Sequence, residues 1–532
     1  MTLTATSPLK QTEPAQQTQE ATPVAARRPN RRAVMVSAVL TQLMIVLDLT
    51  IIAIALPHMQ EDLGMTVSQS PWTVTGYSLA FGGLVLFGGR LCAVVGIRRS
   101  YQVGLIGFGI ASLAAGMATS FPVLLAARVA QGCFGALLAP TSQSLLNVTF
   151  TERTERERVF AIFGATGGLG AAVGLLVGGA LTDWFSWRWA LYINIFLAAA
   201  ALLIGQRSLP PADQRDRGSR ITDDLSGLVL GCGACFSAVY GLDRAQQTSW
   251  TSTSTVSWLA LGGIAAVLFV VRERFASRPV LPLSMMALPV RAASYATQFV
   301  AGAAQMGAII YLTYYMQNHF GYSPLKSGVV FLPMVLALIA TAIPAGRIIV
   351  PRLGARGTLP LGLAVLAGSF LIFSRMTTES TYEHVALPGL IVFGMGLGLT
   401  MPVTFNSGTR GVDAKRTGLA SAILSAAQQI GGSFGVALMT SYATQHAEDY
   451  VTNHAAEVKA TAMEVMMRAQ ALPQSSAGKQ IIESLKAQLI DRAQIEAYSG
   501  GFSMMAWILA GAVAILVVCG IGLRLHRQHQ DR

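Results

Sequence analysis

The sequence predicts an all-α integral membrane protein, built from two pseudo-symmetric six-helix bundles and two inserted helices, with 14 transmembrane helices in total. Three observations support this prediction. The composition is too apolar for a water-soluble domain, the apolar residues gather in runs of span length, and one loop motif occurs twice, about 258 residues apart.

The composition indicates a membrane protein before any segment is considered. Of the 532 residues, 52% are hydrophobic and only 12% are charged, and the mean hydropathy is +0.51. Soluble domains carry about 25% charged residues. The net charge of +12 comes from Lys and Arg in short gaps between apolar runs. That placement suits loops facing anionic lipid, so membrane lipids are expected partners and nucleic acid is not.

A span needs about 20 mostly apolar residues. The predicted spans are 34–56, 72–92, 101–119, 122–146, 158–181, 187–206, 224–243, 255–271, 292–316, 327–349, 358–375, 385–407, 418–443 and 500–524.

These spans divide the chain into predicted domains. They are a disordered cytoplasmic tail (1–33), an N-terminal six-helix bundle (34–206), two inserted helices with cytoplasmic linkers (207–291), a C-terminal six-helix bundle (292–524) with an external loop (444–499), and a cytoplasmic tail (525–532).

The distribution of positive charge predicts the orientation. With the N-terminus inside, cytoplasmic segments hold 28 Lys and Arg and external segments hold nine. This asymmetry predicts that both termini are cytoplasmic and that the 444–499 loop is external. Within that loop, 455–470 and 479–498 have the apolar spacing of amphipathic helices, expected to lie on the outer surface as a tether or, alternatively, as a cap.

The duplicated motif joins two spans in each half. "GGRLCAVVGIR" (88–98) and "GRIIVPRLGAR" (346–356) agree at three of four aligned positions. The aligned positions are Gly88, Arg90, Gly96 and Arg98 in the first copy and Gly346, Ile348, Gly354 and Arg356 in the second.

Asp48 is a carboxylate within the apolar run "VLDLTIIAIALP" (46–57). Such a group costs roughly 2.5–3.5 kcal/mol at the centre of a membrane helix, so it calls for a partner. Counting along the two spans places Asp48 roughly 12 Å and Arg128 roughly 9 Å from the external end. The matching depth predicts an ion pair, with a satisfied packing role for Asp48 and a structural anchor role for Arg128 as alternatives.

Glycines crowd the fifth predicted span at spacings of three and four. Close helix packing and a sliding seam between the two halves both explain such a pattern. The glycines considered for the seam are Gly170, Gly174, Gly178 and Gly179. No strand precedes these glycines and no G-K-[ST] follows them, so a nucleotide-binding loop is not expected.

Taken together, several motifs resemble the fourteen-span drug:proton antiporters of the major facilitator superfamily. "LDLTIIAIALP" (47–57) is similar to the family's first-span motif, with Ala53 at its usual Asn. "LLAARVAQGCFGALLAP" (124–140) resembles the fourth-span Arg motif, and 170–195 resembles the antiporter motif. The resemblance covers about 34–524.

Two departures concern the conformational machinery. The family's loop acid is missing, because Ala93 and Val94 stand at those positions, and Leu175 replaces a proline. The latch is therefore expected to be weakened or built differently. The residues assigned to conformational change on this resemblance are Gly88, Gly96, Arg98 and Arg99, together with the four seam glycines.

The resemblance implies proton-driven export of small amphipathic toxic compounds or antibiotics across the plasma membrane, with Asp48 and Arg128 in proton coupling. The polar and aromatic residues assigned to substrate contact are Gln42, Gln131, Asn194, Gln298, Gln305, Tyr311, Tyr314, Tyr315, Asn406 and Gln428.

No cofactor and no metal are expected, and the protein is expected to be a monomer. Enzymatic activity is not expected, because the sequence offers neither a metal-ligand cluster nor a nucleophile–base pair. A solute or nutrient transporter of the same fold, and a receptor or scaffold that has lost coupling, are the alternatives. Substrate identity, single-antibiotic or multidrug range and proton stoichiometry depend on pocket shape and lie beyond the sequence.

Overall fold

The computed structural model describes residues 30–66, 69, 72–206, 225–276, 279, 281, 284–412, 417–468 and 476–530, which contain helices and no strand. The α-helices are α1 (Arg31–Asp62), α2 (Trp72–Val95), α3 (Ile97–Gly116), α4 (Phe121–Thr149), α5 (Arg153–Trp184), α6 (Trp187–Gly205), α7 (Leu225–Gln247), α8 (Thr253–Phe275), α9 (Ser284–Ala287), α10 (Pro289–Tyr314), α11 (Pro324–Val330), α12 (Leu332–Pro344), α13 (Val350–Phe373), α14 (Leu387–Thr409), α15 (Thr417–Arg468) and α16 (Ser476–Gln530). Short π-helical turns cover Tyr315–His319, Ala345–Ile349 and Tyr382–Ala386.

The all-α membrane architecture is confirmed. Within the described residues, eleven helical stretches are long and apolar enough to cross a membrane. They do not include α3 or α5, and one stretch, Leu325–Phe373, runs across two of the predicted spans. The count of fourteen therefore stays a prediction. The predicted tail (1–33), apart from its last four residues, and most of the 207–224 linker lie outside the described residues.

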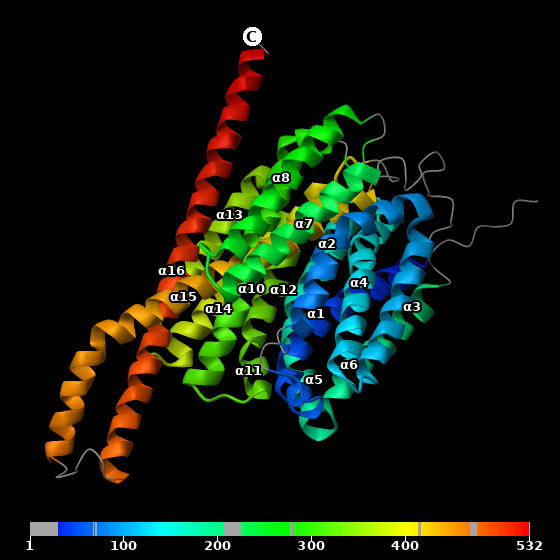
Figure 1. Cartoon of the computed structure of the whole chain (residues 1–532). Helices are drawn as coiled ribbons and strands as arrows, with labels where there is room; N and C mark the ends of the chain where they lie inside the picture. Colours follow the sequence, from blue (N-terminus) through cyan, green and yellow to red (C-terminus); the bar gives the residue numbers. More distant parts are fainter. Residues whose placement is uncertain are drawn as a thin grey trace, which may run out of the picture.

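Helix packing follows the same pattern twice (Figure 1). In the first half the packed pairs include α1–α5, α1–α6, α2–α4, α3–α4 and α3–α6. In the second half α10–α15, α10–α16, α12–α14, α13–α14 and α13–α16 repeat them. The six helices α1 to α6 thus correspond to α10, α12 and α13 to α16, as expected for repeated bundles.

The duplicated loop motif has the same backbone conformation in both halves. Gly96, between α2 and α3, has φ of 96°, and Gly354, at a kink inside α13, has φ of 67°. Only glycine adopts positive φ without a steric penalty. The two glycines therefore permit the same turn at equivalent places, which explains the matched positions in the sequence.

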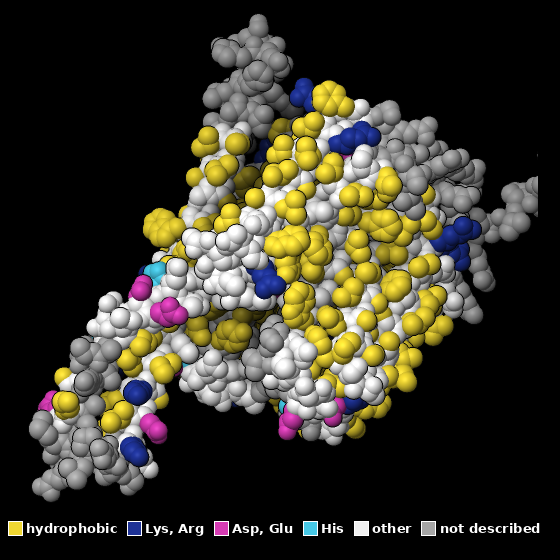
Figure 2. All heavy atoms as spheres, viewed as in Figure 1, with side chains coloured by type: hydrophobic (Ala, Val, Ile, Leu, Met, Phe, Trp, Pro, Cys, Tyr) yellow, Lys and Arg dark blue, Asp and Glu magenta, His cyan; other side chains and the backbone are white. Residues whose placement is uncertain are grey.

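The inserted helices lie outside the two bundles. α7 packs against α2 of the first half and α15 of the second half, and α8 packs on α7. Figure 2 shows that the face over α7 and α8 carries mainly hydrophobic side chains. The insert therefore covers one side of the boundary between the halves and presents an apolar surface to lipid.

The expectation for the 444–499 loop is wrong in one respect. Its two amphipathic segments are not separate surface helices, because they continue the membrane helices as parts of α15 (52 residues) and α16 (55 residues). Both helices extend beyond the bundles on one side (Figure 1). No Pro or Gly interrupts 444–468 or 479–499, so nothing in the sequence ends either helix. α16 also continues through most of the predicted 525–532 tail, to Gln530.

Three glycines of α5 face α1 of their own half. A side chain at Gly174 would overlap Thr50 Oγ1, and Cβ atoms at Gly170 and Gly178 would lie 3.0 Å from Val46 and 2.9 Å from Ile51. The close-packing alternative therefore describes the position of these three. Gly164, earlier in α5, faces α14 of the other half. A seam role for Gly179 stays a prediction.

Gly88 offers a test of the close approach of α2 and α4. A Cβ at Gly88 would overlap the backbone carbonyl oxygen of Ala136, which cannot rotate away. We expect Gly88→Ala to lower the free energy of unfolding by about 1–3 kcal/mol, measured as a decrease in Tm of the purified protein. Gly263→Ala on α8 is the matched control, since a Cβ there has no neighbour within 4 Å. Equal Tm values for the two variants would contradict the packing.

Candidate functional site

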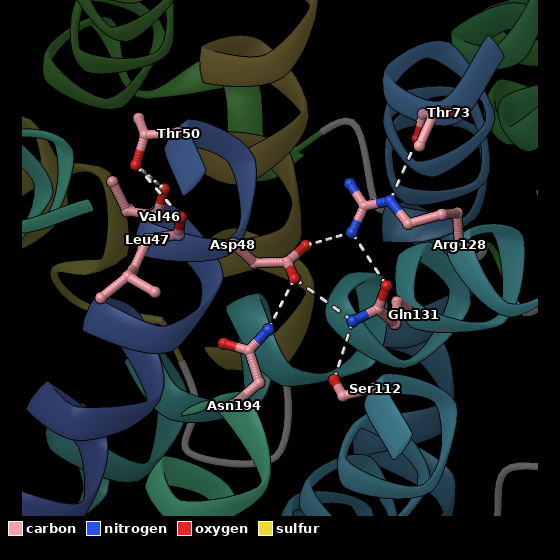
Figure 3. A network of polar contacts seen from close by, with 9 residues as sticks. All are labelled: Val46, Leu47, Asp48, Thr50, Thr73, Ser112, Arg128, Gln131 and Asn194. Atoms are coloured by element: carbon pink, nitrogen blue, oxygen red, sulfur yellow. Dashed lines mark hydrogen bonds and ion pairs between the residues drawn. The ribbon is translucent and has the colours of Figure 1, made fainter. Parts of the chain in front are cut away.

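Asp48 and Arg128 form a buried ion pair between α1 and α4 (Figure 3). Arg128 Nη1 lies 2.6 Å from Asp48 Oδ2, and both side chains have an exposed fraction of 0%. Arg128, predicted to pair with Asp48 because both lie at a similar depth in the membrane, is therefore in contact with it. Gly170, Gly174 and Gly178 let α5 pack closely on α1. Asp48 points toward α4 and α6 (Figure 3).

Two amides complete the coordination of the carboxylate. Asn194 of α6 donates from Nδ2 to Asp48 Oδ1 at 2.6 Å, and Gln131 of α4 donates from Nε2 to the same oxygen at 3.2 Å. Gln131 also lies 2.7 Å from the Ser112 hydroxyl of α3. Three helices, α1, α4 and α6, thus meet at one carboxylate, and α3 is joined to them through Ser112.

The guanidinium is held independently by α2. Arg128 Nε donates to the Thr73 carbonyl oxygen at 3.0 Å, and the guanidinium carbon lies 4.6 Å from the centre of the Tyr77 ring. Arg128 Nη1 also donates to Gln131 Oε1 at 2.8 Å. A cation over an aromatic face in a desolvated site gains about 2 kcal/mol. Arg128 therefore keeps partners on α2 and α4 that do not depend on the charge of Asp48.

This arrangement can act as a protonation switch. An ionised carboxylate with a guanidinium and two amide donors is stabilised, whereas a protonated one loses the ionic attraction. The ion pair links α1 to α4, so its charge state affects how these helices hold together. The side-chain amides of Gln131 and Asn194 both donate hydrogen bonds to this carboxylate.

Thr73, Tyr77 and Ser112 were not among the residues expected at this site. One signal in the sequence points to the first two, because Gly132 and Gly135 follow Arg128 by one and two helical turns. A side chain at Gly132 would overlap the Tyr77 carbonyl oxygen, and a Cβ at Gly135 would lie 3.1 Å from the Tyr77 hydroxyl. Small residues beside a membrane arginine thus mark where a neighbouring helix approaches.

In the second half, one of the predicted polar residues, Gln298, forms a separate, neutral contact. Gln298 of α10 is fully buried, accepts a hydrogen bond from Thr404 of α14 at 2.6 Å and lies 3.6 Å from Met401 Sδ. Gln305 is buried, and Asn406 and Gln428 are partly buried. In the first half, Gln42 is partly buried in α1.

The three tyrosines expected to contact substrate belong to two aromatic clusters. Tyr311 packs edge-on against Tyr314 at 6.1 Å and against Tyr498 of α16 at 5.2 Å. Tyr315 stacks on His319 at 5.1 Å. Tyr311 and Tyr315 are buried, whereas Tyr314 is 48% exposed. Their contact with substrate stays a prediction.

Arg98 and Arg99 lie at the start of α3, next to the Gly96 turn. Arg98 Nη2 donates to the Gln206 carbonyl oxygen at 3.2 Å, which ties α3 to the end of α6, and Arg99 is exposed. These contacts stay within the first half.

A family model described as Major Facilitator Superfamily matches residues 38–436. The chain belongs to the Major Facilitator Superfamily. Asp48, Arg128, Gln131 and Asn194 all lie inside the matched region, and so do both copies of the duplicated loop motif.

Several curated relatives of this superfamily member are similar over most of their length. A puromycin resistance protein of Streptomyces alboniger is 39% identical over 436 residues, covering 81% of this chain and 86% of its own. A cephamycin export protein of Amycolatopsis lactamdurans is 33% identical, covering 76% and 83%. A lincomycin resistance protein of Streptomyces lincolnensis is 30% identical, covering 78% and 85%.

Solved structures of the superfamily share the fold. The human organic anion transporter MFSD10 matches with a TM-score of 0.58 at 14% identity, covering 91% of this chain and 100% of its own. The proton:xylose symporter XylE matches with a TM-score of 0.55 at 12% identity, covering 91% and 96%. This multi-pass membrane protein therefore has the major facilitator fold.

The contribution of the buried Asp48–Arg128 pair to stability can be measured and compared with that of an exposed ion pair. We expect Arg128→Met to lower the free energy of unfolding by about 3–5 kcal/mol, because Asp48 is left buried without its cation. The double variant Asp48→Asn with Arg128→Met removes both charges and is expected to be more stable than Arg128→Met alone, measured as a higher Tm.

Asp62 and Arg188 supply the control. Their ion pair has the same 2.6 Å distance, but the side chains are 47% and 31% exposed. The hydrogen bond from Arg188 holds the pKa of Asp62 below its usual value. Its contribution to stability is therefore present above pH 4 and lost as the pH falls through that lowered pKa. Arg188→Met is expected to cost about 1 kcal/mol or less. A similar loss for both arginine variants would contradict the difference in burial.

Proposed function

We propose that this protein exports amphipathic toxic compounds or antibiotics across the plasma membrane by proton-driven alternating access. The observation that carries the proposal is the buried Asp48–Arg128 pair, at 2.6 Å, inside one half of a major facilitator fold. The named roles of its relatives in antibiotic resistance and export support the class of substrate. Small amphipathic compounds and protons are the proposed partners of a monomeric transporter without a cofactor.

Asp48 is the proposed proton site. Protonation removes the charge that attracts Arg128 Nη1, while the Thr73 carbonyl and the Tyr77 ring remain to hold the guanidinium. The helix pair α1–α4 then loses its ionic link. One proton moving down a potential of 100 mV supplies about 2.3 kcal/mol, enough to bias a conformational equilibrium roughly 50-fold.

The orientation proposed from charge places the termini in the cytoplasm and Asp48 in the external half of the membrane. A carboxylate there takes up protons from outside when the transporter opens outward. Substrate is proposed to bind between the halves, with Gln42, Gln298, Gln305, Asn406 and Gln428 as the candidate polar groups. Gln131 and Asn194, also assigned to substrate from the sequence, donate to Asp48 inside the first bundle.

The halves are in contact near the end where α2 and α14 finish and α15 begins. Gln143 donates to the Ser425 hydroxyl at 3.1 Å, and Thr409 donates to Asn147 Oδ1 at 3.2 Å. Phe163 of α5 packs edge-on against Phe405 of α14, with 6.0 Å between ring centres. We propose that these contacts form the cytoplasmic gate.

The gate contacts join uncharged groups, close to the position where the family's loop acid would stand. A Cβ at Gly89 of α2 would lie 3.0 Å from the Gly418 carbonyl oxygen of α15, so the two backbones approach closely. Ala93 follows Gly89 by one helical turn and is buried. Close packing and neutral hydrogen bonds are therefore proposed to replace the charged latch in this chain.

Asp48→Asn tests the proton site. The amide keeps the shape of the carboxylate but does not titrate, so we expect loss of proton-driven export with normal membrane insertion. Export is measured as efflux of a fluorescent amphipathic substrate from energised cells, with and without a proton uncoupler. Asp62→Asn, on the same helix but exposed, is the control that should retain efflux. Wild-type efflux by Asp48→Asn at equal expression would disprove the proton role.

Gly418→Cys tests whether the gate must open. The Cβ of a residue at 418 would lie 3.5 Å from Cys92 Cβ and 3.4 Å from its sulfur, within the range for a disulfide. We expect oxidation to cross-link α2 to α15 and stop efflux, and reduction to restore it. Gly418→Ser, and Gly418→Cys combined with Cys92→Ser, should not respond to oxidant. Undiminished efflux from fully cross-linked protein would rule out separation of the halves at this point.

A further inference from the structure

A lateral groove of about 490 Å³ lies between α2, α4 and the inserted helix α7. Its walls include Trp72, Leu79 and Leu84 of α2, Leu125 and Val129 of α4, and Phe236 of α7. Val129 is 38% exposed and Phe236 is 37% exposed, so the groove opens on the outer surface of three helices that are apolar enough to cross a membrane. We propose that it binds one acyl chain of a phospholipid, whose phosphate is held by Arg244. This inference does not depend on the export function.

The length of the groove fits one leaflet. Its lining runs along α2 from Trp72 to Leu84, which is roughly 18 Å at 1.5 Å per residue. Half of a bilayer's hydrocarbon core is about 15 Å. An acyl chain lying along α2 would therefore reach from the end of the helix to the middle of the membrane.

Small residues give the groove its depth. Gly76, Ala80 and Gly83 of α2 line it, and a Cβ at Gly76 would lie 2.7 Å from Leu125. Gly233 of α7 also lines it, and a Cβ there has no neighbour within 4 Å. The open space beside Gly233 is therefore available to hydrocarbon and does not have to be created by moving protein atoms.

Two aromatic rings and an arginine follow one another along α7 beside the Trp72 end of the groove. Phe236, Tyr240 and Arg244 follow one another by one helical turn on α7. The Phe236 and Tyr240 rings stack at 6.2 Å, and Tyr240 also lies 6.2 Å from Trp72. Arg244 Nη2 donates to the Tyr240 hydroxyl at 2.7 Å. Aromatic rings and Arg at the end of a span are typical of the headgroup level, and a guanidinium matches a phosphate.

Asp243, next to Arg244 in the sequence, accepts hydrogen bonds from other residues. Asp243 accepts hydrogen bonds from Thr75 of α2 at 3.0 Å and from Gln247 at 2.8 Å. Each carboxylate oxygen therefore has one donor, Thr75 on α2 for Oδ1 and Gln247 on α7 for Oδ2. The phosphate of a bound lipid would therefore be met by Arg244, which stands over the Tyr240 ring at 5.1 Å.

Occupancy of the groove would join the insert to the transporter core. The same stretch of α2 that lines the groove carries Thr73 and Tyr77, which contact Arg128. A lipid chain between α4 and α7 would support α2 from its outer side. The proposed lipid is thus a structural part of the first bundle.

Photo-cross-linking tests the proposal on the full-length protein in nanodiscs. The probe is phosphatidylglycerol with a diazirine at the middle of one acyl chain, and cross-linked peptides are identified by mass spectrometry. We expect cross-links concentrated in 72–84, 125–133 and 232–236. Cross-links spread evenly over the lipid-facing helices would overturn the proposal.

Two glycine variants form a matched pair. Gly233→Phe fills the groove, and Gly263→Phe places the same side chain on α8, where a Cβ also has no neighbour within 4 Å. We expect Gly233→Phe to reduce cross-linking in the three segments at least fivefold and Gly263→Phe to leave it unchanged. Equal cross-linking in both variants would show that the groove does not hold the chain.

Arg244→Gln tests the headgroup contact and does not rely on filling the groove. We expect it to lower cross-linking by phosphatidylglycerol at least threefold, and to leave cross-linking by a diacylglycerol carrying the same diazirine unchanged. An equal effect on both probes, or no effect on either, would rule out phosphate recognition by Arg244.

Discussion

The ion pair between Asp48 and Arg128 imposes the strongest constraint on the first half of this protein. A fully buried carboxylate in a membrane helix is tolerated only with partners, and here it has three, from Arg128, Gln131 and Asn194. Meeting that requirement brings α1, α4 and α6 together at one point. The glycines of α5 then allow α1 to be covered from its other side, and Gly132 allows α2 to reach the guanidinium. Much of the packing in this bundle follows from satisfying one charge.

The two halves use the same helices but different chemistry. The first and fourth helices of the first half, α1 and α4, meet through an ion pair, whereas their counterparts α10 and α14 meet through the neutral contact of Gln298 and Thr404. Within the described residues, this helix pair is therefore linked by an ion pair in the first copy and by a neutral contact in the second. In the proposed mechanism a proton acts on the first bundle directly, and the second responds through the contacts of α5 and α15 across the boundary.

The inserted helices change what surrounds α2. In the first bundle α2 packs on α4, and α7 adds a second neighbour on its outer side. The contact of Asp243 with Thr75 and the groove below it both involve this stretch of α2. Because α2 also carries two contacts to Arg128 and approaches Gly418 near its other end, it connects the lipid-facing surface, the ion pair and the boundary between the halves.

The sequence by itself determined the features that depend on local pattern. Apolar runs predicted the membrane helices, the duplicated motif located the matching turns at Gly96 and Gly354, and counting residues from the span ends placed Asp48 opposite Arg128. Each of these follows from the fixed rise of an α-helix and from the thickness of a bilayer. Gln131 and Asn194 were recognised as polar residues inside spans, without a partner assigned to them.

Only the tertiary structure decided which faces meet. Gly170, Gly174 and Gly178 of α5 pack on α1. Tyr311 packs with Tyr314 and Tyr498, whereas Tyr315 packs on His319. Tyr77 joins the ion pair although its stretch of sequence is otherwise unremarkable for a span. The two amphipathic segments of the 444–499 loop belong to α15 and α16, whereas the sequence predicted membrane helices that end before this loop and begin after it. The physical reason is the same throughout. Hydropathy and helical spacing fix where a helix forms and how deep each residue lies, but the rotation of each helix about its axis is set by the neighbours that pack against it.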